Sequence, residues 1–170
     1  LVMPLETPLE TIETAVSLAN ESGATVVLNP APARPLPAEL LAGIDVLVPN
    51  EPETAQLTAL PIKTEAESRD AARELLALGV GNVVLTLGSR GALVLEGKME
   101  EFTLVPARQV EVVDTTAAGD AFVAGLAVAL GEGKSLVDAA RFANAVGALA
   151  VTKQGAQPGM PTREEIEISL

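Results

Sequence analysis

The sequence predicts an α/β fold, in which a doubly wound, mostly parallel sheet has helices on both faces and a β-hairpin toward its C-terminal side. Short β-branched runs alternate with segments of helical periodicity along most of the chain, which is typical of βαβ units. Apolar residues make up 48% of the chain but aromatic residues only 2%, so Ala, Val, Leu and Ile have to build the core. Such a composition suits helices that cover a buried sheet.

The first predicted unit is a strand, a helix and a second strand. Residues 1–5 have the apolar pattern of a buried strand. Thr7 and Pro8 then supply an N-cap and a first-turn proline for a helix that ends near Ser22. The β-branched run 24–28 is the second strand of this unit.

A proline-rich loop and further βα units follow. Four prolines between residues 30 and 37 exclude a regular helix or a central strand there, because proline fixes φ and lacks a backbone N–H. We expect a loop that ends in a short helix near Glu39. The next expected strands are 45–48 and 82–87, and the next expected helices are 50–59 and 64–78.

A hairpin and two long helices complete the predicted fold. The remaining expected elements are hairpin strands at 92–95 and 101–105 with a turn at 96–98, a strand at 110–113, helices at 119–130 and 135–151, and a short helix from 162. Both long helices are rich in Ala and Gly, which lets helices pack closely. In a doubly wound sheet, ligands bind beyond the carboxyl ends of the strands, so we expect the site there.

The composition narrows the chemistry and the partners. A formal net charge of −12 disfavours nucleic acid and anionic membranes as partners, because both attract clusters of Lys and Arg. The chain has no Cys and no His, so a catalytic base has to be Asp or Glu. Since no apolar run is long enough to span a bilayer, we expect a soluble protein, and the absence of Cys fits a reducing cytoplasm. The opening strand lacks an initiator Met, and we therefore expect residues 1–170 to be a fragment, one portion of a single domain.

The most informative segment is residues 114–122, where a strand is expected to end and a helix to begin. Its sequence, Asp-Thr-Thr-Ala-Ala-Gly-Asp-Ala-Phe, has small residues that allow an anion to reach the backbone N–H groups at the helix N-terminus. Asp120 lies in the first turn, where it can accept a proton from a substrate hydroxyl during phosphoryl transfer. An Asp at such a position can equally be a helix cap, and the residues alone leave both interpretations open.

This segment resembles the signature of the ribokinase (PfkB-type) carbohydrate kinases. The resemblance extends in order over residues 29–34, 49–53, 86–91 and 155–158, and so covers nearly the whole chain. It implies a ribokinase-like fold with Asp120 as the catalytic base and substrate contact. It also implies that Ala117, Ala118 and Gly119 form the anion hole.

The resemblance further implies roles in binding ATP and Mg²⁺. Asn50 and Glu53 match an Asn-x-x-Glu motif that serves the phosphate and Mg²⁺ region, although the same two residues also form a capping-box pattern. The other residues that match ATP contacts are Thr86, Gly88, Ser89, Gly91 and Asn144. The segment from Thr86 to Gly91 also reads as an ordinary strand-to-hairpin turn.

Two further sites are implied by the resemblance. Glu6 matches a residue that contacts the sugar, although a lone carboxylate after a strand is usually solvent-exposed. An activating K⁺ is expected beside the anion hole, with oxygen ligands from Asp114, Thr116, Ala150, Lys153, Gly155 and Gly159. Relatives often have Ser where Gly159 stands, so one hydroxyl contact is missing here. Direct phosphate binding by Lys134 or Lys153 is not expected, because isolated lysines are usually solvated.

Together these resemblances imply an ATP-dependent kinase that phosphorylates the primary hydroxyl of D-ribose, with Mg²⁺ and K⁺ as cofactors and ATP and a small sugar as partners. The sugar-binding half and lid of such kinases have no counterpart here. Relatives often form homodimers through that lid, so the oligomeric state of the complete enzyme stays open, with a homodimer as one possibility. Two alternatives stay open: a kinase for another small sugar or nucleoside, and a nucleotide-binding fragment without catalysis.

Overall fold

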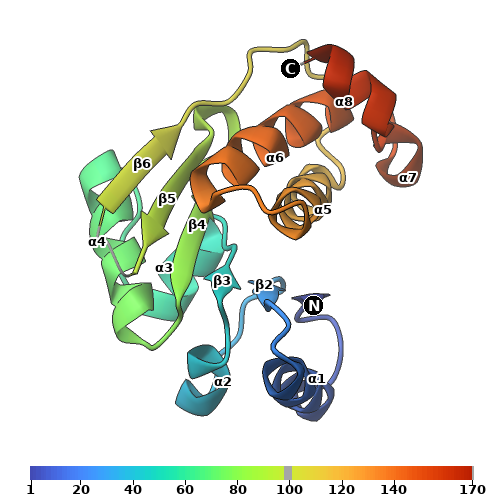
Figure 1. Ribbon diagram of the computed structural model, residues 1–170. Helices are drawn as coiled ribbons and strands as arrows, with labels where there is room; N and C mark the ends of the chain where they lie inside the picture. The colour runs from blue at the N-terminus through green and yellow to red at the C-terminus, as the bar shows by residue number, and fades with distance from the viewer. Residues whose placement is uncertain (98–100, 170) are drawn as a thin grey trace. The chain divides into compact units, whose positions relative to one another are not determined.

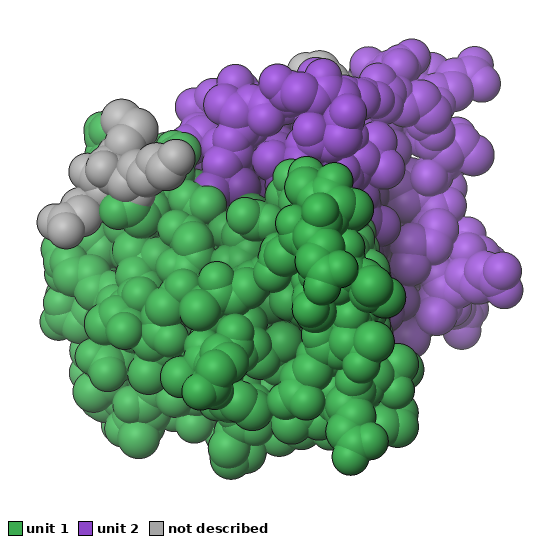
Figure 2. Space-filling model, turned by 60° about the horizontal axis from the view of Figure 1, so that its bottom comes forward, with its two compact units in different colours: residues 1–87, 93–103 green, residues 88–92, 104–170 purple. Residues whose placement is uncertain are grey.

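The computed structural model describes residues 1–97 and 101–169 (Figure 1). The chain divides into two compact units, which Figure 2 shows in different colours. Unit 1 consists of residues 1–87 and 93–103, and unit 2 of residues 88–92 and 104–170. The prediction of one domain portion over 1–170 stays a prediction.

The six strands form one sheet whose spatial order follows the order of the chain. They are β1 (Val2–Pro4), β2 (Val27–Asn29), β3 (Val46–Leu47), β4 (Asn82–Thr86), β5 (Ala92–Glu96) and β6 (Glu101–Val105). The first four are parallel neighbours, with Met3 opposite Leu28, and Leu28 opposite Leu47. The α/β fold with a mostly parallel sheet is therefore confirmed.

Four helices belong to unit 1, and their apolar faces form its core with the strands. They are α1 (Leu9–Ser22), α2 (Ala38–Ala42), α3 (Glu51–Thr58) and α4 (Glu65–Ala77). Ile12 from α1 and Leu75 from α4 lie in one buried cluster with Leu28, Leu47 and Leu85 of the sheet. Arg69 and Arg73 of α4 lie over the ring of Phe102, as cation–π pairs.

Capping boxes start two of these helices, α3 and α4. Thr64 and Glu67 form the reciprocal hydrogen bonds of a capping box at the start of α4, as predicted. The prediction of Thr7 as the cap of α1 is wrong, because the N-cap is Pro8 and no side chain caps the helix. Gly23, in the left-handed conformation at φ 72°, ends α1.

Unit 2 is built on two long helices, α5 (Ala118–Gly131) and α6 (Leu136–Ala150), which lie side by side. Gly125 makes their close approach possible, because a Cβ there would lie 2.8 Å from a Val146 methyl carbon. The short helix η1 (Gly88–Arg90), α7 (Ala156–Gly159) and α8 (Arg163–Ser169) complete the unit. In α8, Arg163 is paired with Glu132 and lies over the ring of Phe142.

The predicted strand at 110–113 is wrong. No strand is found there, and the side chains of Val112 and Val113 are 59% and 58% exposed. A β-branched run forms a strand only where a neighbouring edge accepts its backbone groups. Here the Val113 N–H donates instead to the carbonyl of Val151 at the end of α6.

Other differences are small. The short helix α7 was not expected from the sequence. The two predicted hairpin strands are neighbours in the sheet, as expected. Lys98, in the predicted turn between them, lies outside the described residues. Within the described ranges, none of the helices has the length and apolar character required to cross a bilayer.

Candidate functional site

In unit 1, the residues expected to bind ligands lie just beyond the carboxyl ends of parallel strands. Glu6 follows β1 and is exposed, Asn50 follows β3, and Thr86 is the last residue of β4. Asn50 and Thr86 form a parallel bridge, in which the Thr86 N–H donates to the Pro49 carbonyl at 2.9 Å. The fold thus brings Asn50 and Thr86 together at the edge where ligands bind in such sheets.

Asn50 and Glu53 form the capping box that their spacing suggests. The Glu53 N–H donates to Asn50 Oδ1 at 2.8 Å, and Glu53 Oε2 accepts from the Asn50 N–H at 2.8 Å. The second carboxylate oxygen, Oε1, accepts from Asn50 Nδ2 at 2.8 Å. Burial raises the pKa of Glu53, while the hydrogen bonds from Asn50 act to lower it. The pair is therefore rigid and held at the start of α3, and its role toward Mg²⁺ stays a prediction.

In unit 2, a left-handed residue starts the helix that carries the predicted base. Ala117 is the N-cap of α5 at φ 59°, and no side chain caps this end. Asp120 lies in the first turn and is exposed, so it is not the cap of its helix. A Cβ on Gly119 would meet no atom within 4 Å, which leaves open space beside the helix N-terminus. The local structure fits an anion site, because the first N–H groups of a helix have no partner within it.

Asp114 ties the segment before α5 to the loop after α6. Its Oδ1 accepts from the Thr116 N–H at 2.9 Å and the Thr116 hydroxyl at 2.6 Å. Its Oδ2 accepts from the Gly155 N–H at 2.8 Å. Hydrogen bonds from the Thr116 hydroxyl first, and then from the two backbone N–H groups, lower the pKa of Asp114. Asp114 is therefore held as a carboxylate at this position.

The residues expected to bind K⁺ form one connected group in unit 2. Gly159 is buried, and a Cβ on it would lie 3.2 Å from the Ala150 carbonyl oxygen and 3.7 Å from that of Lys153. The Gly159 N–H donates to the Gly155 carbonyl at 3.1 Å, which connects these carbonyls to the Asp114 and Thr116 network. The Lys153 ammonium pairs with Glu165 at 2.6 Å, so its side chain is committed to α8.

The expected nucleotide loop is a tight turn packed against β6. The Gly91 N–H donates to the Gly88 carbonyl at 3.1 Å across η1, and Ser89 is exposed. A Cβ on Gly91 would lie 2.0 Å from the Val105 carbonyl oxygen. Asn144, 8% exposed, donates to that same oxygen at 3.0 Å. Gly91 and Asn144 thus meet at one carbonyl, and their contacts with ATP stay predictions.

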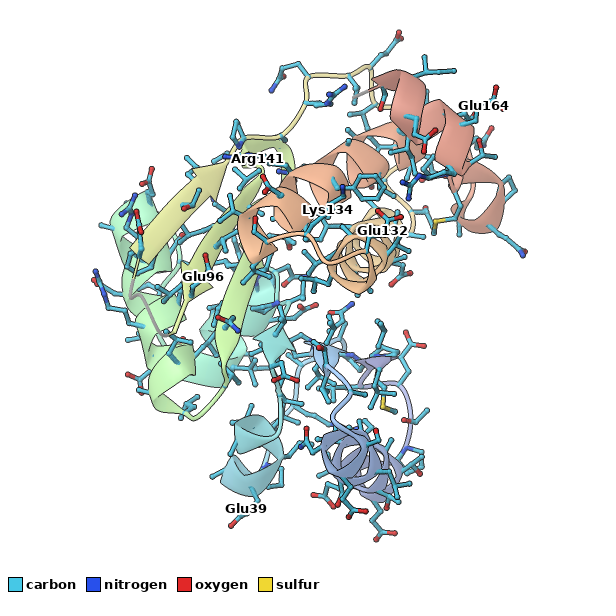
Figure 3. All side chains as sticks on the ribbon, viewed as in Figure 1. Glu39, Glu96, Glu132, Lys134, Arg141 and Glu164 are labelled. Atoms are coloured by element: carbon cyan, nitrogen blue, oxygen red, sulfur yellow. The ribbon has the colours of Figure 1, made fainter. Side chains whose placement is uncertain are left out.

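The structure also shows contacts that sequence reasoning missed. Glu165 pairs with Lys153, and the Val151 carbonyl holds the N–H groups of Val113 and Asp114. No local sequence pattern predicts either contact, because the partners lie far apart in the sequence. Lys134 lies in the exposed turn between α5 and α6, near Glu132 (Figure 3). Its position agrees with the expectation of a solvated lysine.

The fold and the signature motifs define a class of protein: the chain belongs to the pfkB family of carbohydrate kinases, whose family model matches residues 2–163. It is 43% identical over 165 residues to the ribokinase of Haemophilus influenzae, covering 97% of this chain and 53% of that protein.

Solved structures give the same result. The structure of Arabidopsis thaliana ribokinase complexed with ribose and ATP matches with a TM-score of 0.94 at 35% identity, over 99% of this chain and 54% of that one. The structure of Escherichia coli phosphofructokinase-2 in complex with potassium matches with a TM-score of 0.77 at 25% identity, over 98% of this chain and 53% of that one. The chain spans about half the length of the curated relatives it matches.

Proposed function

We propose that residues 1–170 are the C-terminal, ATP-binding and catalytic portion of a cytoplasmic sugar kinase, which transfers the γ-phosphoryl group of ATP to the primary hydroxyl of D-ribose. The product is ribose 5-phosphate. The observation that carries this proposal is the start of α5, where Ala117 turns the backbone and Asp120 lies exposed in the first helical turn. This arrangement places a proton acceptor beside backbone N–H groups that favour developing negative charge.

The proposed reaction divides the work between Asp120 and the backbone. The Asp120 carboxylate accepts the proton of the sugar hydroxyl as that oxygen forms a bond to the γ-phosphorus, and the bond to the β-phosphate oxygen of ATP breaks to release ADP. The N–H groups of Ala117 and Gly119 stabilise the charge on the transferring phosphoryl group, and the Ala118 N–H, which donates to the Thr115 carbonyl at 3.2 Å, turns to the phosphate when it binds. Gly119 serves this contact because no side chain stands between the phosphate and the backbone.

The described residues fit the two cations of the proposal in different ways. No cluster of three or more acidic side chains able to hold a metal is found among residues 1–97 and 101–169, so Mg²⁺ would bind mainly through the ATP phosphates, with Asn50 and Glu53 nearby in support. A K⁺ ion suits the Asp114 carboxylate and the carbonyls of Ala150 and Lys153, because hard cations prefer oxygen ligands.

Ribose is the favoured substrate because the ribokinases of Haemophilus influenzae and Arabidopsis thaliana match this chain over nearly its full length. A kinase for another small sugar or nucleoside is the alternative. Substrate kinetics with ribose, other pentoses, hexoses and nucleosides, measured side by side on the complete enzyme, distinguish the two. The substrate with the highest kcat/KM is the one for which the site is built.

The role of Asp120 is tested by comparing Asp120→Asn with Asp138→Asn in the complete enzyme. Asp138 occupies the third position of α6, as Asp120 does of α5, so the two changes remove the same charge from equivalent places on two helices. We expect Asp120→Asn to lower kcat by about 10²–10⁴-fold with ATP affinity nearly unchanged. Asp138→Asn should keep normal turnover. Normal turnover in Asp120→Asn would remove Asp120 from the proposed mechanism.

A further inference from the structure

The proline-rich loop between β2 and α2 forms hydrogen bonds to the turn that carries Glu6, one on each side of that residue. The Leu5 N–H donates to the Ala31 carbonyl at 2.8 Å, and Arg34 Nη2 donates to the Thr7 carbonyl at 2.9 Å. Leu5 and Thr7 are the two neighbours of Glu6 in the chain. These two hydrogen bonds hold the backbone on either side of Glu6. The Glu6 side chain is exposed and therefore stays accessible.

The loop is itself stiff and anchored. Prolines at 30, 32, 35 and 37 restrict its backbone, because each fixes its own φ and limits the residue before it. From α3, Gln56 Nε2 donates to the Ala33 carbonyl at 2.9 Å. The loop therefore links the Glu6 turn to the same helix that begins with Asn50 and Glu53.

Arg34 is the side chain that connects this loop to the turn carrying Glu6. Its Nε–H is buried and has no acceptor in the described part of the chain, which carries a desolvation cost. Its Nη2 donates to the Thr7 carbonyl, which belongs to the residue next to Glu6.

We propose that Arg34 is a positioning residue for sugar binding, which acts by fixing the backbone of the turn that presents Glu6. The inference rests on the proposed function, because it takes Glu6 as a sugar contact. Loss of the Arg34 bond frees the Thr7 carbonyl, so Glu6 samples more conformations and binds sugar hydroxyls at a larger entropic cost. The chemistry on ATP does not involve this turn.

The test is a double-mutant cycle on sugar binding in the complete enzyme, with Arg34→Ala, Glu6→Gln and the double variant. We expect Arg34→Ala to raise the KM for ribose about tenfold, the loss typical of one charge-assisted hydrogen bond, while kcat and the KM for ATP stay within about twofold. In the Glu6→Gln background, Arg34→Ala should have no further effect, because both changes act through one contact. Arg73→Ala, which removes an exposed ion pair with Asp70 and a contact with the Phe102 ring, is the control for loss of an arginine elsewhere in unit 1 and should leave all three constants unchanged.

A second measurement tests the clamp without relying on activity. Hydrogen exchange of the Leu5 amide should be faster in Arg34→Ala than in the parent protein, and unchanged in Arg73→Ala. If Glu6→Gln raises the KM for ribose but Arg34→Ala does not, or if the two effects are additive, the inference is overturned and the proposed function stands. If the parent enzyme phosphorylates no sugar, the proposed function fails. Unchanged hydrogen exchange of the Leu5 amide in Arg34→Ala overturns the positioning role of Arg34, whatever the activity.

Discussion

Alanine in place of Gly88, the first residue of η1, and of Gly91, the residue after it, should destabilise the protein by different amounts. Gly88 has φ 56° and Gly91 has φ 101°, so alanine at either position pays a backbone cost. For Gly88→Ala the added methyl group meets no atom within 4 Å, and we expect a loss of about 1–2 kcal/mol in the free energy of unfolding, from the backbone alone. Gly88→Ala therefore measures the conformational cost by itself.

Gly91→Ala adds a steric collision to that backbone cost. The new Cβ would lie 2.0 Å from the Val105 carbonyl oxygen, 2.6 Å from the Ala107 nitrogen and 2.8 Å from the Pro106 carbonyl carbon. All three are backbone atoms, and the buried Asn144 side chain holds the Val105 oxygen. Since overpacking costs about 1–3 kcal/mol more, we expect a total loss of about 2–5 kcal/mol.

Urea denaturation of the two variants and the parent, at one temperature and pH, measures both losses. The difference between the variants reports the collision together with the larger backbone cost at Gly91, whose φ of 101° lies outside the left-handed region that alanine adopts. Nucleotide titration on the same samples then shows whether the turn must keep its shape to bind ATP. Equal losses of stability in Gly88→Ala and Gly91→Ala would refute the packing argument, and would mean that the turn moves away from β6 at little cost.

The remaining predictions concern charge and nucleotide binding. Hydrogen bonds lower the pKa of Asp114 in the folded state below its ordinary value of 3.8, so the stability that Asp114 contributes is present above pH 3.8 and is lost as the pH falls through the folded-state pKa. In chemical denaturation at a series of pH values, Asp114→Asn should therefore lose less stability at acid pH than the parent protein. An unchanged pH profile would contradict this expectation. Burial raises the folded-state pKa of Glu53 above 4.5, so stability is full below 4.5 and falls as the pH rises through the folded pKa. Glu53→Gln, which keeps a residue suited to a capping box, should remove that fall, and a parallel profile in the two proteins would contradict the expectation. Calorimetric titration with a non-hydrolysable ATP analogue and Mg²⁺, with and without K⁺, should show saturable binding that Asn50→Ala weakens; absence of binding to both this chain and the complete enzyme would refute the nucleotide site.

The parts of the fold that the sequence predicts are those set by neighbouring residues. Thr64 and Glu67 are three positions apart, and their capping box follows from that spacing. The same reasoning reaches Asn50 and Glu53, where the observed hydrogen bonds match the pattern. The start of α1 shows the limit, since Thr7 and Pro8 both suit a helix start and the choice between them depends on one residue of register.

Contacts between distant segments could not be predicted in the same way. The Asp114 carboxylate accepts from Gly155, 41 positions away, and no periodicity in either segment indicates it. The valines at 110–113 look like a strand because β-branched residues favour one, yet only the presence of a neighbouring edge decides. For the candidate site, the family motifs indicated which residues to consider. Their contacts with distant residues, such as the ion pair of Lys153 with Glu165, are seen only in the structure.

The order of the strands has a consequence for how the chain reaches its native state. Every pair of neighbouring strands in the sheet is also consecutive along the chain, and α5 and α6 are a consecutive pair as well. Each pairing therefore closes only the loop between adjacent elements, so the entropy lost before a contact forms stays small. We expect β1 to β4 to assemble by adding neighbouring strands in chain order, together with the helices between them.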